Sequence, residues 1–431
     1  MGLPEWMNHT ECEVDLTGQT FTIWHIGDLS GPYAPITQPL VAALDDAVAY
    51  YNAHGGICGA EITLPDPTTV DTGGDQEQTS VIYDRVSSEN PVMVTLYSSD
   101  DSELLAGRLL EDKIPVVISA GSVQGLYGED AKSPGWIYAT NPLYIDQIGT
   151  FCDYVGANME GQVIGYLSWP NAFGRAAFTP EVVAYCESVG VGFVETPEFF
   201  APGADIQGQI QNLMDGGATI LYTNSLATGP AEIAAAVTNM GISDQVQLAG
   251  VNWTLDTSVG FLGQTTLNPT TKLPSVDGLI GSMPFHWWTE VDQPGIQLIK
   301  EQADASERGA LTRNIAYILG WQNVDLFVET VTLTANANNG EVNGELINAV
   351  MAELDFNPLG LVHLNFQDGN RDASLNRIAV LKYLGQDGAS PAGPDNPPMV
   401  VEGPNGPVLV PIVVPLTDFV ETPDLRPMGS E

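Results

Sequence analysis

The fold of this chain is decided by residues 19–56, which read QTFTIWHIGDLSGPYAPITQPLVAALDDAVAYYNAHGG. The first eight residues are rich in β-branched and aromatic side chains, a composition typical of a strand. A loop with glycine and proline follows at residues 27–33, and Pro39 suits the first turn of a helix. Apolar residues then recur at helical spacing until Gly55 and Gly56, which indicate a helix end. The stretch therefore predicts a strand, a loop and a helix in that order.

The same alternation continues along the chain. Further strands are expected at residues 60–64, 91–96, 114–119, 162–167, 192–198, 219–223, 246–251 and 378–384. Further helices are expected at residues 76–87, 102–111, 144–157, 174–189, 206–214, 230–240, 312–335 and 341–354. Strands that alternate with helices in this way are typical of βαβ units in a parallel sheet. The rhythm restarts after Asn141, so we expect an α/β protein of two doubly wound units.

Composition limits the classes of function. The chain has 431 residues, of which 44% are hydrophobic, and this is too long for a single core. There are 13 Lys and Arg residues against 54 Asp and Glu residues, and the net charge is -41. So few cations exclude binding to nucleic acid or to anionic lipid, both of which need basic patches. We interpret the acidity as adaptation of the whole surface to a salty habitat rather than as the mark of one cationic partner.

The cysteines favour an oxidising compartment. None of the four has the spacing of a metal site. Pairing of neighbours in the sequence, one of three possible pairings, would give Cys12 with Cys58 and Cys152 with Cys186. Four buried free thiols are the alternative.

Neither a membrane span nor an export signal is visible. No apolar run approaches the roughly 20 residues that cross a bilayer. Residues 408–416 come nearest, but Pro411 and Pro415 interrupt them, and they predict a strand. Residues 1–10 contain no apolar segment of the signal-peptide kind, and we expect that an export signal has been removed.

Signatures of catalysis are missing from the sequence. There is no GxSxG, HExxH, P-loop or GxGxxG pattern, and the five histidines are scattered. His25 falls in the first predicted strand, where a core role is expected. We therefore expect a protein that is not an enzyme and needs no cofactor. An α/β hydrolase or transferase is the less favoured alternative.

Four segments together resemble a known family. They are IGDLSGPYA at 26–34, AVAYYNAHGGICG at 47–59, IPVVISAGS at 114–122 and YILGWQNVDLFVET at 317–330. In this order they resemble the type I periplasmic-binding fold, in particular the branched-chain amino-acid branch of ABC-transporter solute-binding proteins. The resemblance covers roughly residues 20 to 385.

The resemblance implies two lobes joined by three crossovers, near Asn141, Met283 and Asn357, with the ligand in the cleft. The lobes would be residues 20–141 plus 284–357 and residues 142–283 plus 358–385. A tail rich in proline and glycine, residues 386–431, would wrap around them. It also implies a periplasmic or extracellular monomer that closes like a hinge on a small ligand and delivers it to the membrane permease of an ABC importer. A sensor module of the same fold is the alternative.

Ligands of open parallel sheets bind beyond the carboxyl ends of the strands, where helix N-termini present unpaired N–H groups. The loops of the first lobe at this edge are residues 30–33, 97–100 and 120–122. The resemblance implies that hydroxyls and amides there hold the carboxylate of the ligand. The matching residues are Ser98, Ser99, Gly121 and Ser122. Ordinary helix capping would explain the serines as well. Val123 stands where the family often has threonine, so one hydroxyl is missing.

The second lobe departs from the family pattern at one position. Its loops are residues 168–174, 222–228 and 251–253. Branched-chain amino-acid binders carry an acidic residue on the last loop, where this chain has Asn252. An amide contributes no charge, and charge-assisted hydrogen bonds are roughly twice as strong as neutral ones. Asp256, Asp100 or Asp28 could supply the missing charge, or the ligand lacks an ammonium group.

Aromatic residues complete the predicted site. Six of them fall at predicted loop tips, where they suit apolar or cationic parts of a ligand: Tyr33, Tyr97, Trp169, Phe173, Tyr222 and Trp253. Packing in the core is the alternative for each. Residues 285–288, Phe-His-Trp-Trp, are expected to pack at the second crossover. The predicted ligand-binding set is Tyr33, Tyr97, Ser98, Ser99, Gly121, Ser122, Phe173, Tyr222, Asn252 and Trp253.

Overall fold

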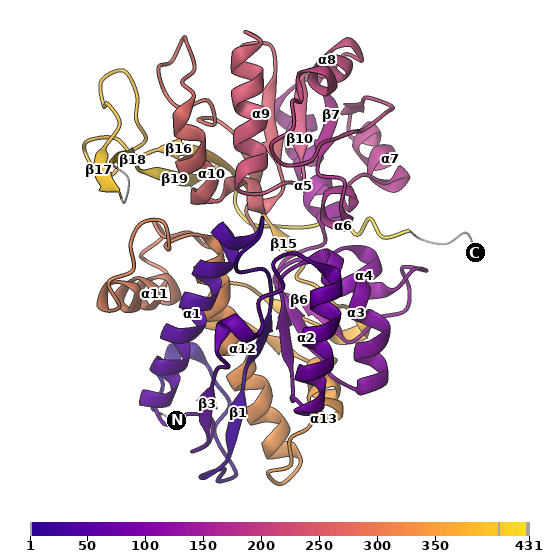
Figure 1. Ribbon diagram of the computed structural model, residues 1–431, viewed down its shortest axis with the longest axis vertical. Coiled ribbons are helices and arrows are strands. Elements are labelled where there is room, and N and C mark those ends of the chain that lie inside the picture. Colours follow the sequence, from indigo (N-terminus) through magenta and orange to yellow (C-terminus); the bar gives the residue numbers. More distant parts are fainter. Residues whose placement is uncertain (1, 404–405, 428–431) are drawn as a thin grey trace. The chain divides into compact units, whose positions relative to one another are not determined.

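The computed structural model describes residues 2–403 and 406–427, which form two compact units (Figure 1). Unit 1 comprises Met1–Leu143 and Phe285–Ser374, and unit 2 comprises Tyr144–Pro284 and Leu375–Glu431. Each unit is therefore assembled from two separate stretches of chain.

The third change of unit lies later in the chain than the sequence analysis placed it, at residue 374 instead of near Asn357. Residues between these points pack on unit 1. Strands β13 (Asp355–Phe356) and β14 (Leu364–Asn365) pair with each other in antiparallel fashion. The Arg371 guanidinium donates to the carbonyl of Gly135, and Ala139 N–H donates to the carbonyl of Arg371.

Unit 1 is built on a parallel sheet with the strand order β2-β4-β5-β6. The strands are β2 (Trp24–Ile26), β4 (Val94–Leu96), β5 (Val116–Ile118) and β6 (Ile137–Ala139). A second parallel pair is formed by β1 (Thr20–Thr22) and β3 (Glu61–Thr63). Strands β4, β5 and β6 are wholly buried, as expected for a parallel sheet that is covered on both faces.

Most helices described in unit 1 begin at side chains that cap them. The helices are α1 (Ala34–Ala53), α2 (Gln76–Ser88), α3 (Ser99–Asp112), α4 (Val123–Tyr127), α11 (Pro294–Ala305), α12 (Ile315–Ala337) and α13 (Gly344–Met351). Asp75, Ser98, Ser122, Asn314 and Asn343 each accept a backbone N–H in the first turn of a helix. Helix α12 is buried along nearly its whole length and packs against α1.

Pro39 does not lie in the first turn of a helix, as the sequence suggested. Helix α1 begins five residues earlier, at Ala34, and already carries Pro35 at its start. A proline within a helix leaves the carbonyl four residues before it without its usual donor. That carbonyl belongs to Pro35, and it accepts a hydrogen bond from Asn314 Nδ2 at 3.4 Å. The helix therefore continues through Pro39.

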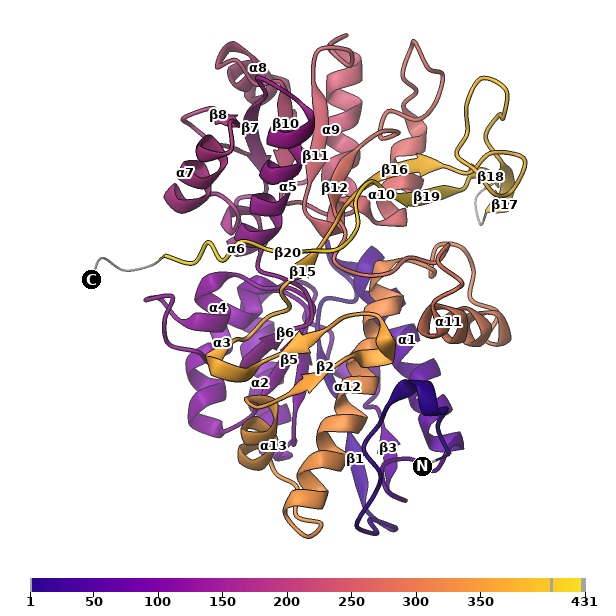
Figure 2. The ribbon, with the colours of Figure 1, turned by 180° about the vertical axis from the view of Figure 1, so that it is seen from behind.

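Unit 2 contains a larger sheet with the order β19-β16-β12-β11-β10-β7-β8, while β9 also pairs with β7 (Figure 2). The parallel strands are β7 (Val163–Ser168), β8 (Gly192–Phe193), β9 (Glu198–Phe199), β10 (Ile220–Thr223), β11 (Gln247–Gly250) and β12 (Ile280–Ser282). Strands β16 (Ile378–Tyr383) and β19 (Pro411–Pro415) extend the sheet in antiparallel fashion.

The helices of unit 2 are α5 (Tyr144–Asn158), α6 (Ala172–Arg175), α7 (Pro180–Ser188), α8 (Gln207–Asp215), α9 (Thr228–Asn239) and α10 (Thr257–Leu262). The single helix predicted over residues 174–189 is in fact α6 and α7. The break follows from Thr179, which caps α7, and from Pro180 at the first helical position, a start signal that also disfavours helix before it. The described residues also contain six short 3₁₀ segments: η1 (Glu5–Met7), η2 (Pro67–Thr69), η3 (Asn252–Leu255), η4 (Gly263–Thr265), η5 (Pro358–Gly360) and η6 (Gln367–Gly369).

The tail after residue 385 belongs to unit 2 and contributes strands to it. The predicted strand at residues 408–416 is divided at residue 410 between β18 (Gly406–Leu409), which pairs with β17 (Val400–Gly403), and β19 in the main sheet. Strand β20 (Val420–Glu421) pairs with β15 (Leu375–Asn376). Leu425 N–H then donates to Asp146 on α5. The tail wraps one unit and completes its sheet.

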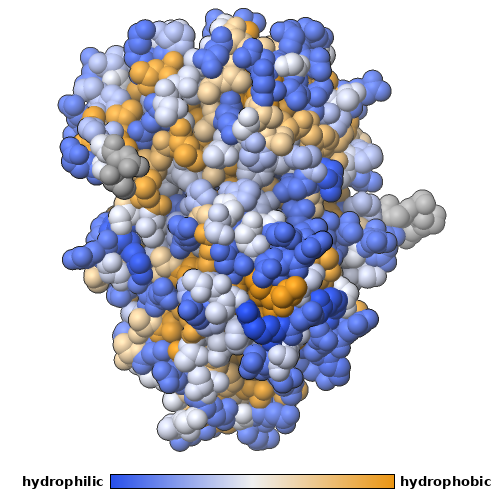
Figure 3. Space-filling view, viewed as in Figure 1, coloured by the Kyte–Doolittle hydropathy of each residue, from blue (hydrophilic) through white to orange (hydrophobic). Residues whose placement is uncertain are grey.

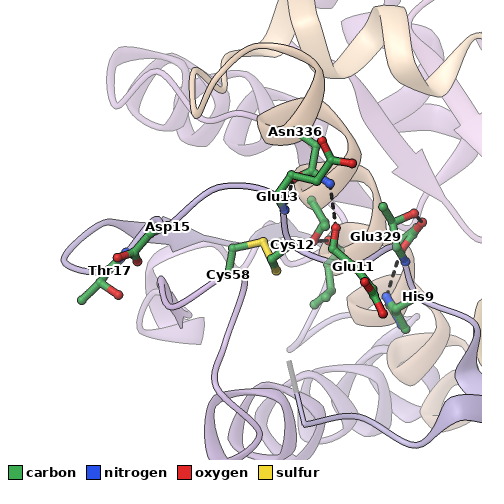
Figure 4. Close-up of a disulfide and its surroundings, with 12 residues drawn as sticks. His9, Glu11, Cys12, Glu13, Asp15, Thr17, Cys58, Glu329 and Asn336 are labelled. Atoms are coloured by element: carbon green, nitrogen blue, oxygen red, sulfur yellow. Dashed lines mark hydrogen bonds and ion pairs between the residues drawn. A yellow bond between two sulfur atoms is a disulfide. The ribbon is translucent and has the colours of Figure 1, made fainter.

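Each unit contains one disulfide, and the pairing joins sequence neighbours. Cys12 is bonded to Cys58 in unit 1, and Cys152 is bonded to Cys186 in unit 2. In unit 1 the bond fastens the first residues of the chain beside α12, where His9 contacts Glu329 and Glu13 N–H donates to Asn336 (Figure 4). Within the described residues no helix is long and apolar enough to cross a membrane.

Candidate functional site

The loop after β2 in unit 1 is shaped by one carboxylate. Asp28 accepts the backbone N–H groups of Ser30, Gly31 and Tyr33, and it is almost fully buried. A Cβ on Gly31 would lie 2.4 Å from the carbonyl oxygen of Gly73 and 2.7 Å from Asp28 Oδ2. Only glycine fits at this position. The Asp28 side chain holds the loop through these three hydrogen bonds.

The two serines after β4 have different surroundings. Ser98 is the N-cap of α3, and its hydroxyl accepts Asp101 N–H at 3.4 Å. Ser99 begins the helix, and its hydroxyl has no hydrogen-bond partner among the described residues although its side chain is only 2% exposed. A buried hydroxyl without a partner costs free energy unless something else binds it. Ser99 is therefore the better ligand contact of the pair.

In the loop after β5, the Ser122 hydroxyl is already hydrogen-bonded within the protein. Ser122 caps α4, and its hydroxyl donates to Glu103 Oε1 at 2.6 Å. A Cβ on Gly121 would meet the end of the Leu126 side chain, which would have to shift to make room for it. Ser119, which the sequence analysis did not select, is fully buried, and its hydroxyl lacks a partner in the described chain.

Tyr33 and Tyr97 form an aromatic pair in unit 1. Their ring centroids are 5.8 Å apart in an edge-to-face arrangement, and both side chains are at least nine-tenths buried. The sequence placed the two residues on different loops, and the structure brings them together. Such pairs contribute about 0.5–1.5 kcal/mol beyond the burial of their area.

The first turn of α3 carries a carboxyl group with a perturbed pKa. Burial raises the pKa of Asp101 from 3.8 to about 7, the hydrogen bond from Thr79 opposes the rise, and the charges of Asp100 and Asp28 add to it. Thr79 Oγ1 lies 2.8 Å from Asp101 Oδ1. The folded protein therefore favours the protonated form of Asp101 below about pH 7.

In unit 2, Asn252 lies two residues after the end of β11 and is fully buried. Its backbone N–H donates to Gln147 Oε1 at 3.0 Å, whereas neither polar atom of its side chain has a partner within the described residues. Asp256, one candidate for the missing charge, accepts Ser258 N–H as the cap of α10. Asn252 thus offers a neutral donor and a neutral acceptor at the strand edge.

The loop after β10 is anchored by Ser168 at the end of β7. Ser168 Oγ donates to the carbonyl of Asn224 at 2.6 Å and accepts the N–H of Asn224 at 3.0 Å. Asn224 Nδ2 donates to the carbonyl of Phe173, while Oδ1 has no partner among the residues described. Gly229 lies nearby, where a Cβ would meet Ser225 Oγ at 2.5 Å and Trp169 Nε1 at 3.0 Å.

The predicted aromatic residues of unit 2 separate into two groups. Trp253 Nε1 donates to Tyr144 Oη at 3.2 Å, and the Tyr144 ring lies 5.1 Å from that of Phe173. Tyr222 is not at a loop tip: it lies inside β10, fully buried and stacked on Tyr166. The Tyr222 ring is part of the core of unit 2, because β10 is buried along its whole length.

Residues that the sequence analysis missed share one signal. Ser119 and Asn224 follow directly after β5 and β10, and Asn141 lies two residues after the end of β6. All three are fully buried or nearly so and have side-chain polar atoms without partners in the described chain. A polar residue within two positions of the end of a buried strand could have identified them. Asn141 entered the sequence analysis only as a crossover.

Other features of the chain lie away from these loops. His25 donates to or accepts from Thr95 Oγ1 at 2.9 Å, and burial lowers its pKa to about 4, so it is a neutral core residue. The described residues hold no cluster of three His, Cys, Asp or Glu side chains suited to a metal. Two surface hollows of unit 1, of about 640 and 690 Å³, are lined by residues of α1, α11, α12 and α13 and contain none of the predicted site residues.

The sequence profile of the periplasmic binding protein family matches residues 20–379. The match covers most of the chain, and the chain belongs to this family. Periplasmic binding proteins are binding proteins, not enzymes, and the two-unit α/β fold is that of type I members. No match is found among curated protein sequences.

Solved structures share the fold. A branched-chain amino-acid ABC transporter protein from Thermus thermophilus with bound valine is 17% identical, with a TM-score of 0.74 and coverage of 94% of this chain and 98% of that one. A fatty acid ABC transporter substrate-binding protein from Thermomonospora curvata is 18% identical (TM-score 0.71, coverage 96% and 96%). A solute-binding protein from R. palustris in complex with 4-hydroxybenzoate is 17% identical (TM-score 0.68, coverage 86% and 95%). The fold therefore accompanies ligands of several chemical classes.

Proposed function

We propose that this protein is the solute receptor of an ABC importer, and that it closes around a small polar ligand bound by strand-edge loops of both units. Family membership over residues 20–379 supports a binding role. The observation that carries the proposal is a set of buried polar side chains without partners among the described residues. Ser99 and Ser119 belong to unit 1, and Asn224 and Asn252 belong to unit 2.

Such groups are rare in folded proteins because each one left unsatisfied costs about 1–3 kcal/mol. All four lie at the carboxyl ends of parallel strands, the edge at which α/β sheets bind ligands. A polar ligand would satisfy hydroxyls in one unit and amides in the other. Binding would thus recover a cost that is already present in the free protein.

The ligand we propose is amino-acid-like, an amide or a small carboxylate. The neutral side chain of Asn252 gives unit 2 no anion at the position where branched-chain amino-acid binders have one. The aromatic group of Trp253, Tyr144 and Phe173 suits an apolar portion of the ligand. We further propose that the protein is a monomer of the periplasm or the cell exterior and delivers its ligand to a membrane permease.

The proposal is tested by a thermal-shift screen of the whole protein against amino acids, short amides, and aliphatic and aromatic acids. A ligand that binds only the folded state adds about 2.7 kcal/mol at a hundredfold excess over its Kd. Asn252→Leu should abolish the shift that the wild-type protein shows. It should leave the free protein as stable as before or slightly more stable, because the amide has no partner to lose.

Ser80→Ala is the control, since Ser80 is a half-buried residue of α2 whose hydroxyl bonds to the carbonyl of Gln76. It should preserve both stability and ligand binding. If Asn252→Leu binds every ligand as the wild-type protein does, Asn252 is not part of the site. If no compound of any class binds, and mass spectrometry of the denatured protein finds no co-purified ligand, the receptor function itself is wrong.

A further inference from the structure

The polar groups at the strand edge of unit 1 include an unusual number of acids. Asp28 follows β2, and Asp100, Asp101 and Glu103 lie at the start of α3, which follows β4. Helix N-termini are partly positive and usually attract anions, so acids in the first turn are ordinary caps on an exposed helix. Here Asp28 and Asp101 are nearly fully buried, at 2% and 5% exposure.

Several donors that could hold a ligand carboxylate in this unit are already bonded to acidic groups of the protein. The amides of the loop after β2 donate to Asp28. Ser122 Oγ donates to Glu103, and Ser98 Oγ lies against the N–H of Asp101. A carboxylate ligand that used these donors would have to displace these bonds and would enter beside charges of its own sign.

The electrostatic surroundings of Asp101 are negative. The charges that raise its pKa are those of Asp100 and Asp28. Like charges in a buried site disfavour ionisation, whereas a nearby cation restores it. A cation placed at this edge would therefore be attracted by two buried carboxyls.

Two further observations point to a ligand at the same edge. Ser99, in the same helical turn as Asp101, is buried with a hydroxyl that has no partner among the described residues. The rings of Tyr33 and Tyr97 lie 5.8 Å apart, and the N–H of Tyr33 is bonded to Asp28. Aromatic faces beside carboxylates are the usual setting for ammonium groups.

We propose that unit 1 receives the ammonium end of the ligand, so that the charged end is held by Asp101, Asp28 and the Tyr33–Tyr97 pair instead of by the loop that contains Asn252. This inference rests on the proposed receptor function. It reverses the polarity expected from the family resemblance, in which the first lobe holds a carboxylate. The class of substrate it names is an amine, an amino-acid amide or another cation of that size.

The test uses matched trios that differ only in their charged ends. One trio is L-leucine, L-leucinamide and 4-methylpentanoate; the second is L-phenylalanine, L-phenylalaninamide and 3-phenylpropanoate. Isothermal titration should show binding by an amine-only member of a trio, at least about tenfold tighter than by its acid-only partner. Asp101→Asn should weaken amine binding by about tenfold or more, since it removes one charge-assisted hydrogen bond.

Asp84→Asn is the control variant, because Asp84 is an exposed carboxylate of unit 1 that pairs with Arg108. It changes the net charge equally and should leave amine binding intact. Tighter binding by the acid-only members would overturn the inference and leave the receptor function standing. Amine binding that Asp101→Asn does not alter would also overturn it. Absence of binding by every member, together with a negative broad screen, would overturn both proposals.

Discussion

The strand edges of the two units differ in the chemistry of their polar groups. In unit 1 the polar groups are acids, hydroxyls and a tyrosine pair, and Asp101 has a pKa raised to about 7 by burial. In unit 2 they are the amides of Asn224 and Asn252 beside an indole, with hydroxyls that bond to the backbone. The same α/β framework thus carries a titrating edge in one unit and a neutral edge in the other. The strand edge of unit 1 should respond to pH through Asp101, whereas the amides of Asn224 and Asn252 in unit 2 should not.

The largest effect should come from Asp101. Its folded pKa is raised from 3.8 to about 7, so the folded state favours the protonated form. The free energy of unfolding should be highest below pH 3.8 and fall as pH rises through 7, by about 4 kcal/mol in all. Asp101→Asn should remove this slope. Urea unfolding of both proteins between pH 4 and 8 measures it.

Asp84→Asn again serves as the control and should keep the wild-type slope, because its carboxylate is exposed. An equal fall in stability for the wild type and Asp101→Asn would show that Asp101 is not the group responsible. The acidic edge of unit 1 would then differ from unit 2 in composition only.

A second effect of pH in unit 1 should come from His9. Burial lowers its pKa, but ion pairs with Asp325 and Glu329 at 2.6 and 3.0 Å outweigh burial and raise it to about 9. The imidazolium should therefore contribute about 3 kcal/mol below pH 6.5, and this contribution should be lost as pH rises through 9. His9→Gln should be less stable than the wild type at pH 6 and closer to it at pH 10.

His363→Gln provides the comparison, because His363 makes its ion pair with Asp355 on the surface of the same unit. Exposed pairs contribute little, so this variant should unfold like the wild type at both pH values. If His9→Gln lost as much stability at pH 10 as at pH 6, the loss would come from packing and not from charge.

The smallest effect belongs to unit 2. Ser168→Ala removes the hydroxyl that bonds both the carbonyl and the N–H of Asn224, and leaves buried groups unsatisfied. The expected loss is about 2 kcal/mol, and it should be the same at pH 5 and pH 8 because no titrating group is involved. Ser258→Ala, whose buried hydroxyl has no partner in the described chain, should cost almost nothing. If the stability lost in Ser168→Ala varied with pH, the strand edge of unit 2 would not differ from that of unit 1 in its response to pH.

Much of the fold could be predicted because buried parallel strands produce compact apolar runs. Residues 114–119 were expected to form a strand, and β5 occupies Val116–Ile118. The pairing of the tail could not be predicted, because β19 pairs with β16 and the residues of β19 do not indicate which strand they pair with. The split of α6 from α7 could have been predicted from Thr179 and Pro180.

The candidate site also has one part that the sequence predicts and one part that it does not. The loops follow from strand ends, so their positions were accessible from the sequence. Which hydroxyl is bonded and which lacks a partner depends on side chains brought from elsewhere. Glu103 engages Ser122 across the boundary between α3 and its neighbouring loop. Ser98 and Ser99 are adjacent serines that the sequence does not distinguish. Only the position at which α3 begins makes Ser98 its N-cap and leaves Ser99 with a buried hydroxyl that lacks a partner among the described residues. The predicted binding residues therefore remain predictions that the variants above test.

The position of β19 in the sheet of unit 2 constrains the order in which the chain can fold. The sheet begins with residues near 163 and ends with residue 415, and the second segment of unit 1 lies between them. During synthesis the earlier strands of this sheet cannot pair with β16 and β19 until about 90 residues of unit 1 have been synthesised. A chain that ended before β19 would present β16 as an unpaired edge, open to pairing with a second chain. Completion of the last strand thus protects the nascent protein from self-association.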